Sequence, residues 1–114
     1  MKHQMSLKPL PFHQIKEGYK TIELRLYDEK RKTIAIGDTI IFTNTEDVNE
    51  KVKVEVIDLY FFDSFEALYN TLPLNECGYT DENLQYASYL DMEQYYSKEQ
   101  QSLYGVVGIK INLV

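Results

Sequence analysis

The 114-residue sequence contains a single cysteine, no tryptophan and only three prolines. Because Cys77 has no second cysteine to pair with, an internal disulfide is excluded and the fold depends on its core. No apolar run approaches the roughly 18 residues that a membrane-spanning helix needs. The opening residues, MKHQMSLKPLPF, lack the continuous apolar stretch of a secretory signal. These absences predict a cytoplasmic protein with no membrane association.

The length predicts one domain that spans residues 1–114. A chain of this size buries a core without disulfide or metal staples. Hydrophobic residues make up 44% of the chain and charged residues 26%, which is ordinary for a soluble globular protein.

The charge is unevenly distributed along the chain. The net charge of −6 opposes non-specific binding to a polyanion. Residues 1–32, however, carry eight Lys and Arg against four Asp and Glu, whereas residues 33–114 carry four against fourteen. An anionic ligand would therefore meet the N-terminal third, although a solvated basic face with nothing bound would show the same pattern.

Local patterns predict an α+β domain with several strands and two to four short helices. Residues 21–27 alternate, so that apolar side chains occupy one face of a half-buried strand and polar side chains the other. Further strands are expected at 39–43, 51–62 and 104–113, with a polar hairpin at 44–50. Helices are expected at 9–18, 64–71, 81–87 and 91–97.

A few curved strands are expected to close into a small β-barrel, because closure removes their exposed edges. In the last strand, Gly105 and Gly108 indicate a bulge or a close backbone approach. The expected barrel core consists of alternating and β-branched apolar residues, namely Ile22, Leu24, Leu26, Ile41, Val54, Val56, Val107 and Ile109.

The polar face that follows Gly18 is the most informative part of the sequence. Glu23 and Arg25 are two residues apart on a strand, so both project from one face, which Thr21 shares, and Lys20 lies just before them. An arginine can bind phosphate or carboxylate with two parallel hydrogen bonds, and a glutamate can accept from a base amine. The alternative is a surface ion-pair ladder that contributes little energy.

The pattern Gly18-x-Lys20-x-x-Glu23-x-Arg25 resembles the G-x-K-x-x-E-x-R motif of the ASCH domain family. The Gly37–Asp38 turn before a hydrophobic strand and the final strand from Tyr104 are similar to the same family. The resemblance covers nearly the whole chain. It implies a PUA-like β-barrel, a cleft between the barrel and a helix, and a role in binding RNA.

The family that the sequence resembles also includes an enzymatic branch, the N4-acetylcytidine amidohydrolase-like proteins. In that branch a lysine, a threonine and a glutamate are the proposed catalytic residues. Lys20 matches the lysine, Glu23 stands where the threonine would be, and Glu76 is the nearest candidate for the glutamate. The candidate catalytic set is therefore Lys20, Glu23 and Glu76. A carboxylate at position 23 favours the charged form of Lys20, so binding is expected in preference to hydrolysis.

The expected ligand is RNA, a nucleoside or a nucleotide, and no cofactor is expected. The candidate ligand-binding residues are Lys20, Thr21, Glu23, Arg25, Tyr19 and Tyr79. No metal site is expected, because His3 and His13 are isolated from other ligand-type residues. The tyrosines of the C-terminal third are interpreted mainly as core residues, although an exposed tyrosine patch would instead favour a protein-interaction module.

Overall fold

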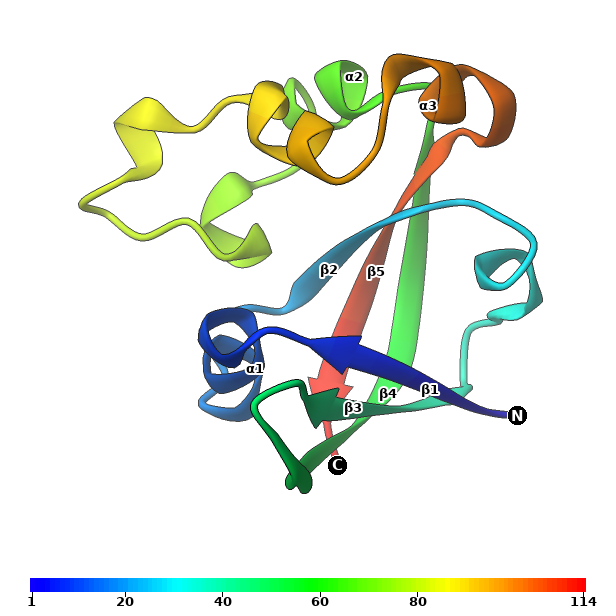
Figure 1. Ribbon diagram of the computed structural model, residues 1–114, viewed down its shortest axis with the longest axis vertical. Coiled ribbons are helices and arrows are strands. Elements are labelled where there is room, and N and C mark those ends of the chain that lie inside the picture. Colours follow the sequence, from blue (N-terminus) through cyan, green and yellow to red (C-terminus); the bar gives the residue numbers. More distant parts are fainter.

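The computed structural model describes residues 1–114 as a five-stranded mixed sheet curled into a half-barrel, with short helices packed on it (Figure 1). The strands are β1 (Lys2–Leu7), β2 (Ile22–Leu26), β3 (Thr39–Asn44), β4 (Asp47–Phe62) and β5 (Val106–Leu113). The α-helices are α1 (Pro9–Lys16), α2 (Phe65–Tyr69) and α3 (Lys98–Tyr104). The 3-10 helices are η1 (Arg31–Thr33), η2 (Leu74–Cys77), η3 (Leu84–Tyr86) and η4 (Tyr89–Gln94). The predicted α+β class and barrel-type sheet are confirmed.

The two ends of the sheet do not meet in a backbone ladder. The strands follow the order β1-β3-β4-β5-β2, with β1 parallel to β3 and every other pair antiparallel. Strands β1 and β2 are therefore the two edges of the half-barrel. The line between them, called the seam below, is where the barrel stays open.

Strand β4 runs the length of the molecule beside β5 (Figure 1). It contributes side chains to two separate apolar clusters. A register shift between Val56 and Asp58 marks a β-bulge in this strand. Before the bulge Val54 lies in the barrel core, whereas after it Leu59 packs on that core and Tyr60 packs on the helical side. Because the bulge inverts the alternation of faces, one strand supplies both clusters.

Strand β2 is buried on both faces. The prediction that its apolar side chains lie in the barrel core is wrong. Ile22, Leu24 and Leu26 are buried, but they pack against Phe65 and Leu68 of α2 in a second cluster outside the barrel. This helical layer, formed by α2, η2, η3, η4 and α3, covers the upper end of the sheet in Figure 1.

The opposite face of β2 points toward the barrel interior. Glu23 is paired with Ile109 and Arg25 with Val107 across the ladder to β5, and both partners belong to the barrel core. The predicted core positions Val54, Val56, Val107 and Ile109 are confirmed. The prediction for Ile41 is wrong, since the β3 register buries Ile40 and Phe42 and leaves Ile41 half-exposed.

Strand β1 has no counterpart among the predicted elements. Its burial alternates, with His3, Met5 and Leu7 inward, and this period of two is a local signal for a strand. The parallel pairing of Lys2–Leu7 with Thr39–Asn44 crosses more than 30 residues of chain. Its partner strand was therefore not identifiable from neighbouring sequence.

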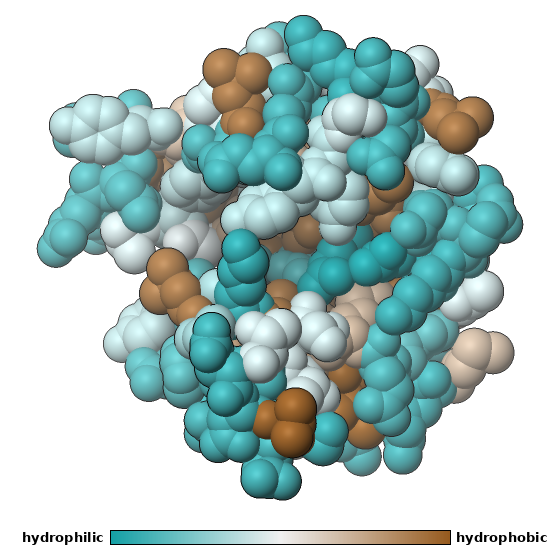
Figure 2. Space-filling view, viewed as in Figure 1, coloured by the Kyte–Doolittle hydropathy of each residue, from teal (hydrophilic) through white to brown (hydrophobic).

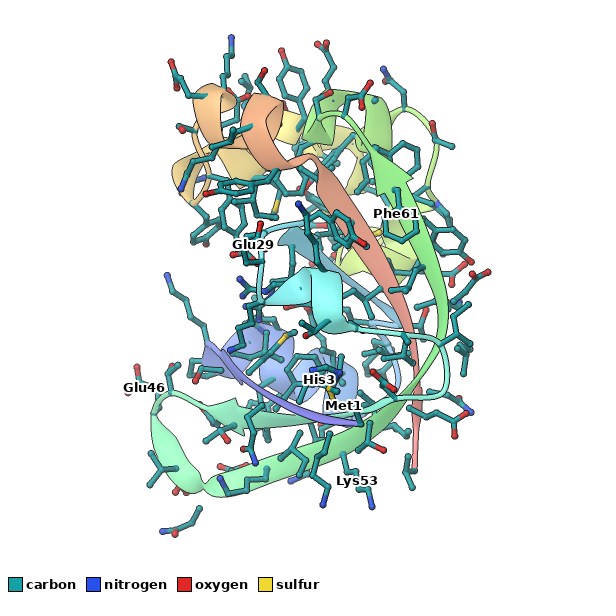
Figure 3. All side chains as sticks on the ribbon, turned by 90° about the vertical axis from the view of Figure 1, so that its right-hand side faces the viewer. Met1, His3, Glu29, Glu46, Lys53 and Phe61 are labelled. Carbon is teal, nitrogen blue, oxygen red and sulfur yellow. The ribbon has the colours of Figure 1, made fainter.

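The Gly37–Asp38 turn is confirmed, with Gly37 at φ +95°. Asp38 accepts hydrogen bonds from the buried His3 side chain at 2.8 Å and from the Ala35 backbone at 3.0 Å. These two interactions, His3 first, hold the pKa of Asp38 well below its usual range. His3 is buried, whereas Phe61, which pairs with Val107 across the ladder, is 55% exposed (Figure 3 labels both).

The C-terminal helices begin at different residues from those predicted. The expected helices at 81–87 and 91–97 are the shorter 3-10 helices η3 and η4, and α3 occupies 98–104, where no helix was expected. Ser97 and Gln100 form a capping box at the start of α3. This S-x-x-Q spacing is the sequence signal that marks the helix. None of the helices combines the length and apolarity needed to cross a membrane.

Gly105 connects α3 to β5 with φ +73° and ψ −177°, a region that is essentially restricted to glycine. A Cβ here would lie 3.2 Å from the Phe62 carbonyl oxygen, whereas a Cβ on Gly37 would meet nothing within 4 Å. We expect Gly105→Ala to lower the unfolding free energy by about 2–3 kcal/mol, and Gly37→Ala by about 1 kcal/mol. Urea denaturation of both variants measures the difference, and an equal loss would contradict this account of the α3–β5 junction.

Candidate functional site

Three charged side chains meet on the inner face of β2, beside the seam. The two carboxylate oxygens of Glu23 lie 2.7 Å from Lys20 Nζ and 2.7 Å from Arg25 Nε. The side chains are 4% exposed for Glu23, 11% for Lys20 and 13% for Arg25. The residues that the motif singles out therefore come together, and they do so in a recessed cluster rather than in an exposed ladder.

The end of α1 positions Lys20. The chain leaves the helix through Gly18 at φ +85°, and the backbone nitrogens of Tyr19 and Lys20 both donate to the Gln14 carbonyl. This turn carries the chain directly from the helix into β2. Gly18 provides the positive φ that a side chain would resist.

The two cations keep Glu23 ionised despite its burial. Burial alone would raise the pKa of Glu23, but the charges and hydrogen bonds of Lys20 and Arg25 lower it to about 2. Burial likewise acts to lower the pKa of Arg25, and this effect is outweighed by Glu23 and by the Tyr96 hydroxyl, so the pKa is raised. The cluster thus carries one negative and two positive charges, a net positive site.

Arg25 joins three parts of the molecule. Its Nη2 donates to the Ser6 carbonyl of β1 at 3.0 Å, which spans the seam where no backbone ladder exists. It also interacts with Tyr96, whose ring stacks on Phe65 at 5.8 Å in the helical layer. The guanidinium therefore links both edges of the half-barrel to the helices above them.

Thr21 and Glu76 form a second cluster with Lys110, separate from the first. Thr21 donates to Glu76 Oε1 at 2.9 Å and accepts from Lys110 at 3.3 Å, while Lys110 also pairs with Glu76. Hydrogen bonds from Lys110 and then from Thr21 lower the pKa of Glu76. The structure thus places Thr21 and Glu76 together, but neither makes a direct ion pair or hydrogen bond with Glu23.

The two predicted cleft tyrosines have different surroundings. Tyr19 is 74% exposed. Tyr79 donates to Asp91 at 2.6 Å and is hydrogen-bonded to the Tyr69 hydroxyl at 2.7 Å. Burial, followed by the hydrogen bond to Asp91, raises the pKa of Tyr79 well above its usual range. Tyr79 therefore fixes the loop between α2 and η4, which is a structural contact.

Cys77 is a buried thiol rather than a nucleophile. It is 6% exposed, and burial raises the pKa of its thiol to about 12. A thiol at neutral pH is a poor nucleophile compared with a thiolate. No group of three His, Cys, Asp or Glu side chains is arranged to hold a metal ion.

A furrow crosses one face of the molecule between the helical layer and the half-barrel, as Figure 2 shows. Two of the contacts between these layers pair a cation of the half-barrel with a tyrosine of the helical layer. Arg25 on β2 meets Tyr96, and the Lys8 ammonium, at the junction of β1 and α1, lies 5.3 Å from the centroid of the Tyr95 ring. The recessed Arg25 and the exposed Lys8 thus each lie beside a tyrosine of the helical layer.

Comparison with known protein families identifies the family to which this chain belongs. A model of the ASCH domain matches residues 5–114. The chain belongs to the ASCH domain family. This family is thought to bind RNA. No curated protein matches the sequence.

Solved structures agree with this assignment. The crystal structure of hypothetical protein PH0355 is 33% identical, covers 100% of both chains and superposes with a TM-score of 0.82. The solution structure of protein PF0455 from Pyrococcus furiosus is 30% identical, covers 100% of this chain and 98% of the other, and has a TM-score of 0.74. ASCH from Zymomonas mobilis is 16% identical, covers 96% of this chain and 65% of its own, and shares the fold with a TM-score of 0.65.

Sequence reasoning missed several residues that contact or neighbour the candidate site of this ASCH domain. Ser6 contributes a backbone oxygen, for which no side-chain signal exists. Lys110 lies in the last predicted strand, where its position among apolar residues was a usable signal. Lys8, Tyr95 and Tyr96 come together only because β1 and η4 are brought close by the fold.

The ionised Glu23 makes the stability of this ASCH domain pH-dependent. Its pKa falls from 4.5 to about 2 on folding, so its contribution is present above pH 4.5 and is lost as the pH drops through about 2. We expect the stability gap between wild type and Glu23→Gln to shrink by about 3 kcal/mol between about pH 6 and pH 2. Chemical denaturation across this range measures the gap.

Glu82→Gln is the matched control, because Glu82 is exposed and takes part in no ion pair. Its stability is expected to follow that of wild type throughout. A Glu23→Gln gap that stays constant with pH would mean that Glu23 is not ionised between its two cations.

Proposed function

We propose that this ASCH domain binds RNA, or a nucleotide-like part of it, through Lys20 and Arg25 at the seam. The observation that carries the proposal is the buried Glu23 carboxylate with a cation on each oxygen. A carboxylate in this position holds both cations in a fixed geometry without neutralising the whole site. A phosphate or a carbonyl group can then approach cations that are already oriented.

Glu23 acts in this proposal as a positioning residue. Both of its oxygens are engaged at 2.7 Å and its side chain is 4% exposed, so it has little capacity left to read a base amine. The ligand is instead recognised through acceptor groups, phosphate oxygens or base carbonyls, by Lys20 and Arg25. Arg25 offers a planar donor group suited to such acceptors.

The charge distribution supports a local rather than an extended contact. The whole chain has a net charge of −6, and a polyanion would be repelled by most of its surface. Residues 1–32 provide Lys20, Arg25 and most of the other cations. The favourable contact area is therefore small, which suits a few nucleotides.

The direct test removes the Lys20–Glu23 pair as a unit. Lys20→Gln with Glu23→Gln keeps the net charge and leaves no buried carboxylate facing a missing partner. We expect this double variant to bind a short single-stranded RNA about tenfold more weakly, because one good contact to phosphate or base contributes about 1–3 kcal/mol. The slope of log affinity against log salt should fall by about 0.7.

The chain offers a matched control pair, Lys53→Gln with Glu55→Gln. These residues are also one lysine and one glutamate close together in the chain, but both are exposed on β4 (Figure 3 labels Lys53). This control is expected to bind as wild type does. If both double variants bind RNA as wild type does, or if both lose the same amount of affinity, the result would contradict a role for the seam cations.

The contacts of Lys20 and Glu76 argue against the amidohydrolase alternative. The Lys20 ammonium lies 2.7 Å from a carboxylate, which stabilises its charged form and opposes nucleophilic attack. The Glu76 carboxylate is engaged by Lys110 and Thr21 and makes no direct ion pair with Lys20. We expect no turnover of N4-acetylcytidine above the buffer rate in an assay of cytidine release. Turnover that is lost in Lys20→Ala would overturn this expectation.

A further inference from the structure

Two adjacent tyrosines after η4 have opposite environments. Tyr96 is half-buried, stacks on Phe65 at an interplanar angle of 20° and interacts with Arg25. Tyr95 is 57% exposed and has the Lys8 ammonium 5.3 Å from its ring centroid. Tyr96 is thus explained by packing, whereas Tyr95 presents a large aromatic surface to solvent beside Lys8.

The contact between Lys8 and Tyr95 contributes too little stability to explain why the Tyr95 ring is kept exposed at this position. An exposed cation–π contact contributes little stability, and Lys8 is itself exposed. A base that stacks on the Tyr95 ring would displace the ammonium and free it for the phosphate of the same nucleotide. An aromatic ring beside a movable cation is the arrangement that single-stranded nucleic acid binders use.

The burial of the two seam cations, Lys20 and Arg25, also favours an unpaired nucleotide as the ligand. Lys20 and Arg25 are only 11% and 13% exposed, so a ligand has to insert a group to reach them. A flexible single strand can turn a nucleotide inward, whereas a duplex holds its bases in the stack and its phosphates on a rigid surface. Both the exposed ring and the recessed cations therefore favour unpaired nucleotides.

We infer that Lys8 and Tyr95 form a subsite, next to the Arg25–Tyr96 contact, that stacks an unpaired base and binds its phosphate, so that the ligand is single-stranded RNA. This inference rests on the proposed function, because it adds a subsite to the Lys20–Arg25 contact. It assigns Tyr95 to base stacking and Lys8 to phosphate binding. Neither residue is part of the ASCH motif.

The experiment measures fluorescence anisotropy with a labelled single strand of about eight nucleotides, a length within the range of small binding domains. The same strand annealed to its complement is the duplex probe. Wild type is compared with Tyr95→Ala, Tyr95→Phe and Lys8→Ala. The controls are Tyr86→Ala, at a tyrosine that is 74% exposed, and Lys53→Ala, at an exposed lysine on β4.

We expect Tyr95→Ala to weaken single-strand binding about tenfold, which is the typical loss for one stacked base. Tyr95→Phe should retain wild-type affinity because the ring remains, and Lys8→Ala should mainly flatten the salt dependence. The duplex should bind at least tenfold more weakly than the single strand. Tyr86→Ala and Lys53→Ala should match wild type.

The outcomes separate this inference from the proposed function. Full affinity of Tyr95→Ala, or duplex binding as tight as single-strand binding, overturns the subsite even if Lys20→Gln with Glu23→Gln weakens binding. A Tyr95→Ala loss combined with full affinity of that double variant overturns the seam contact instead. Equal losses in Tyr95→Ala and Tyr86→Ala would indicate non-specific contact with tyrosines and would also contradict the subsite.

Discussion

Glu23 points from β2 into the open edge of the half-barrel, where its carboxylate is almost completely removed from solvent. A charge in this position would be very costly unless paired on both oxygens. Lys20 provides one partner from the turn after α1, and Arg25 provides the other from the same strand. Arg25, paired at Nε with Glu23, donates from Nη2 to Ser6 and interacts with Tyr96, so this cluster connects the seam to the helical layer.

The fold makes such a cluster possible because both faces of β2 are buried. Its apolar face packs against α2, while its backbone pairs with β5. Its polar face can then occupy an unclosed part of the barrel, where backbone pairing with β1 is replaced by a side-chain contact. The bulge in β4 has a matching role, since it directs the far end of that strand toward the helical layer that contains Tyr96.

Local periodicity predicted much of this architecture. The alternation in residues 21–27 correctly separated Ile22, Leu24 and Leu26 from Glu23 and Arg25, and the motif correctly brought Lys20 to them. What alternation cannot specify is which face meets which layer, so the apolar face was assigned to the barrel instead of the helices. That choice depends on the sheet order, with β2 at an edge, and on contacts across the whole chain.

Residues whose roles arise from long-range contact were beyond local prediction for the same reason. Strand β1 finds its parallel partner far along the chain, and Lys8 meets Tyr95 only after both layers have assembled. Glu76 entered the candidate set through a loose resemblance, and its contacts with Thr21 and Lys110 arise from elements far apart in the chain. Charge type and spacing therefore predicted the motif cluster, but not its neighbours.

Nuclear magnetic resonance of the Arg25 side chain during titration with single-stranded RNA tests the central claim most directly. The Nε–H group donates to Glu23 inside the protein, whereas the remaining guanidinium protons lie toward the seam. The account predicts that the Nε–H resonance keeps its ion-paired position while the terminal Nη resonances and those of Lys20 shift on binding. Saturation with RNA that leaves both Arg25 and Lys20 unchanged, with shifts confined to another surface, would contradict it.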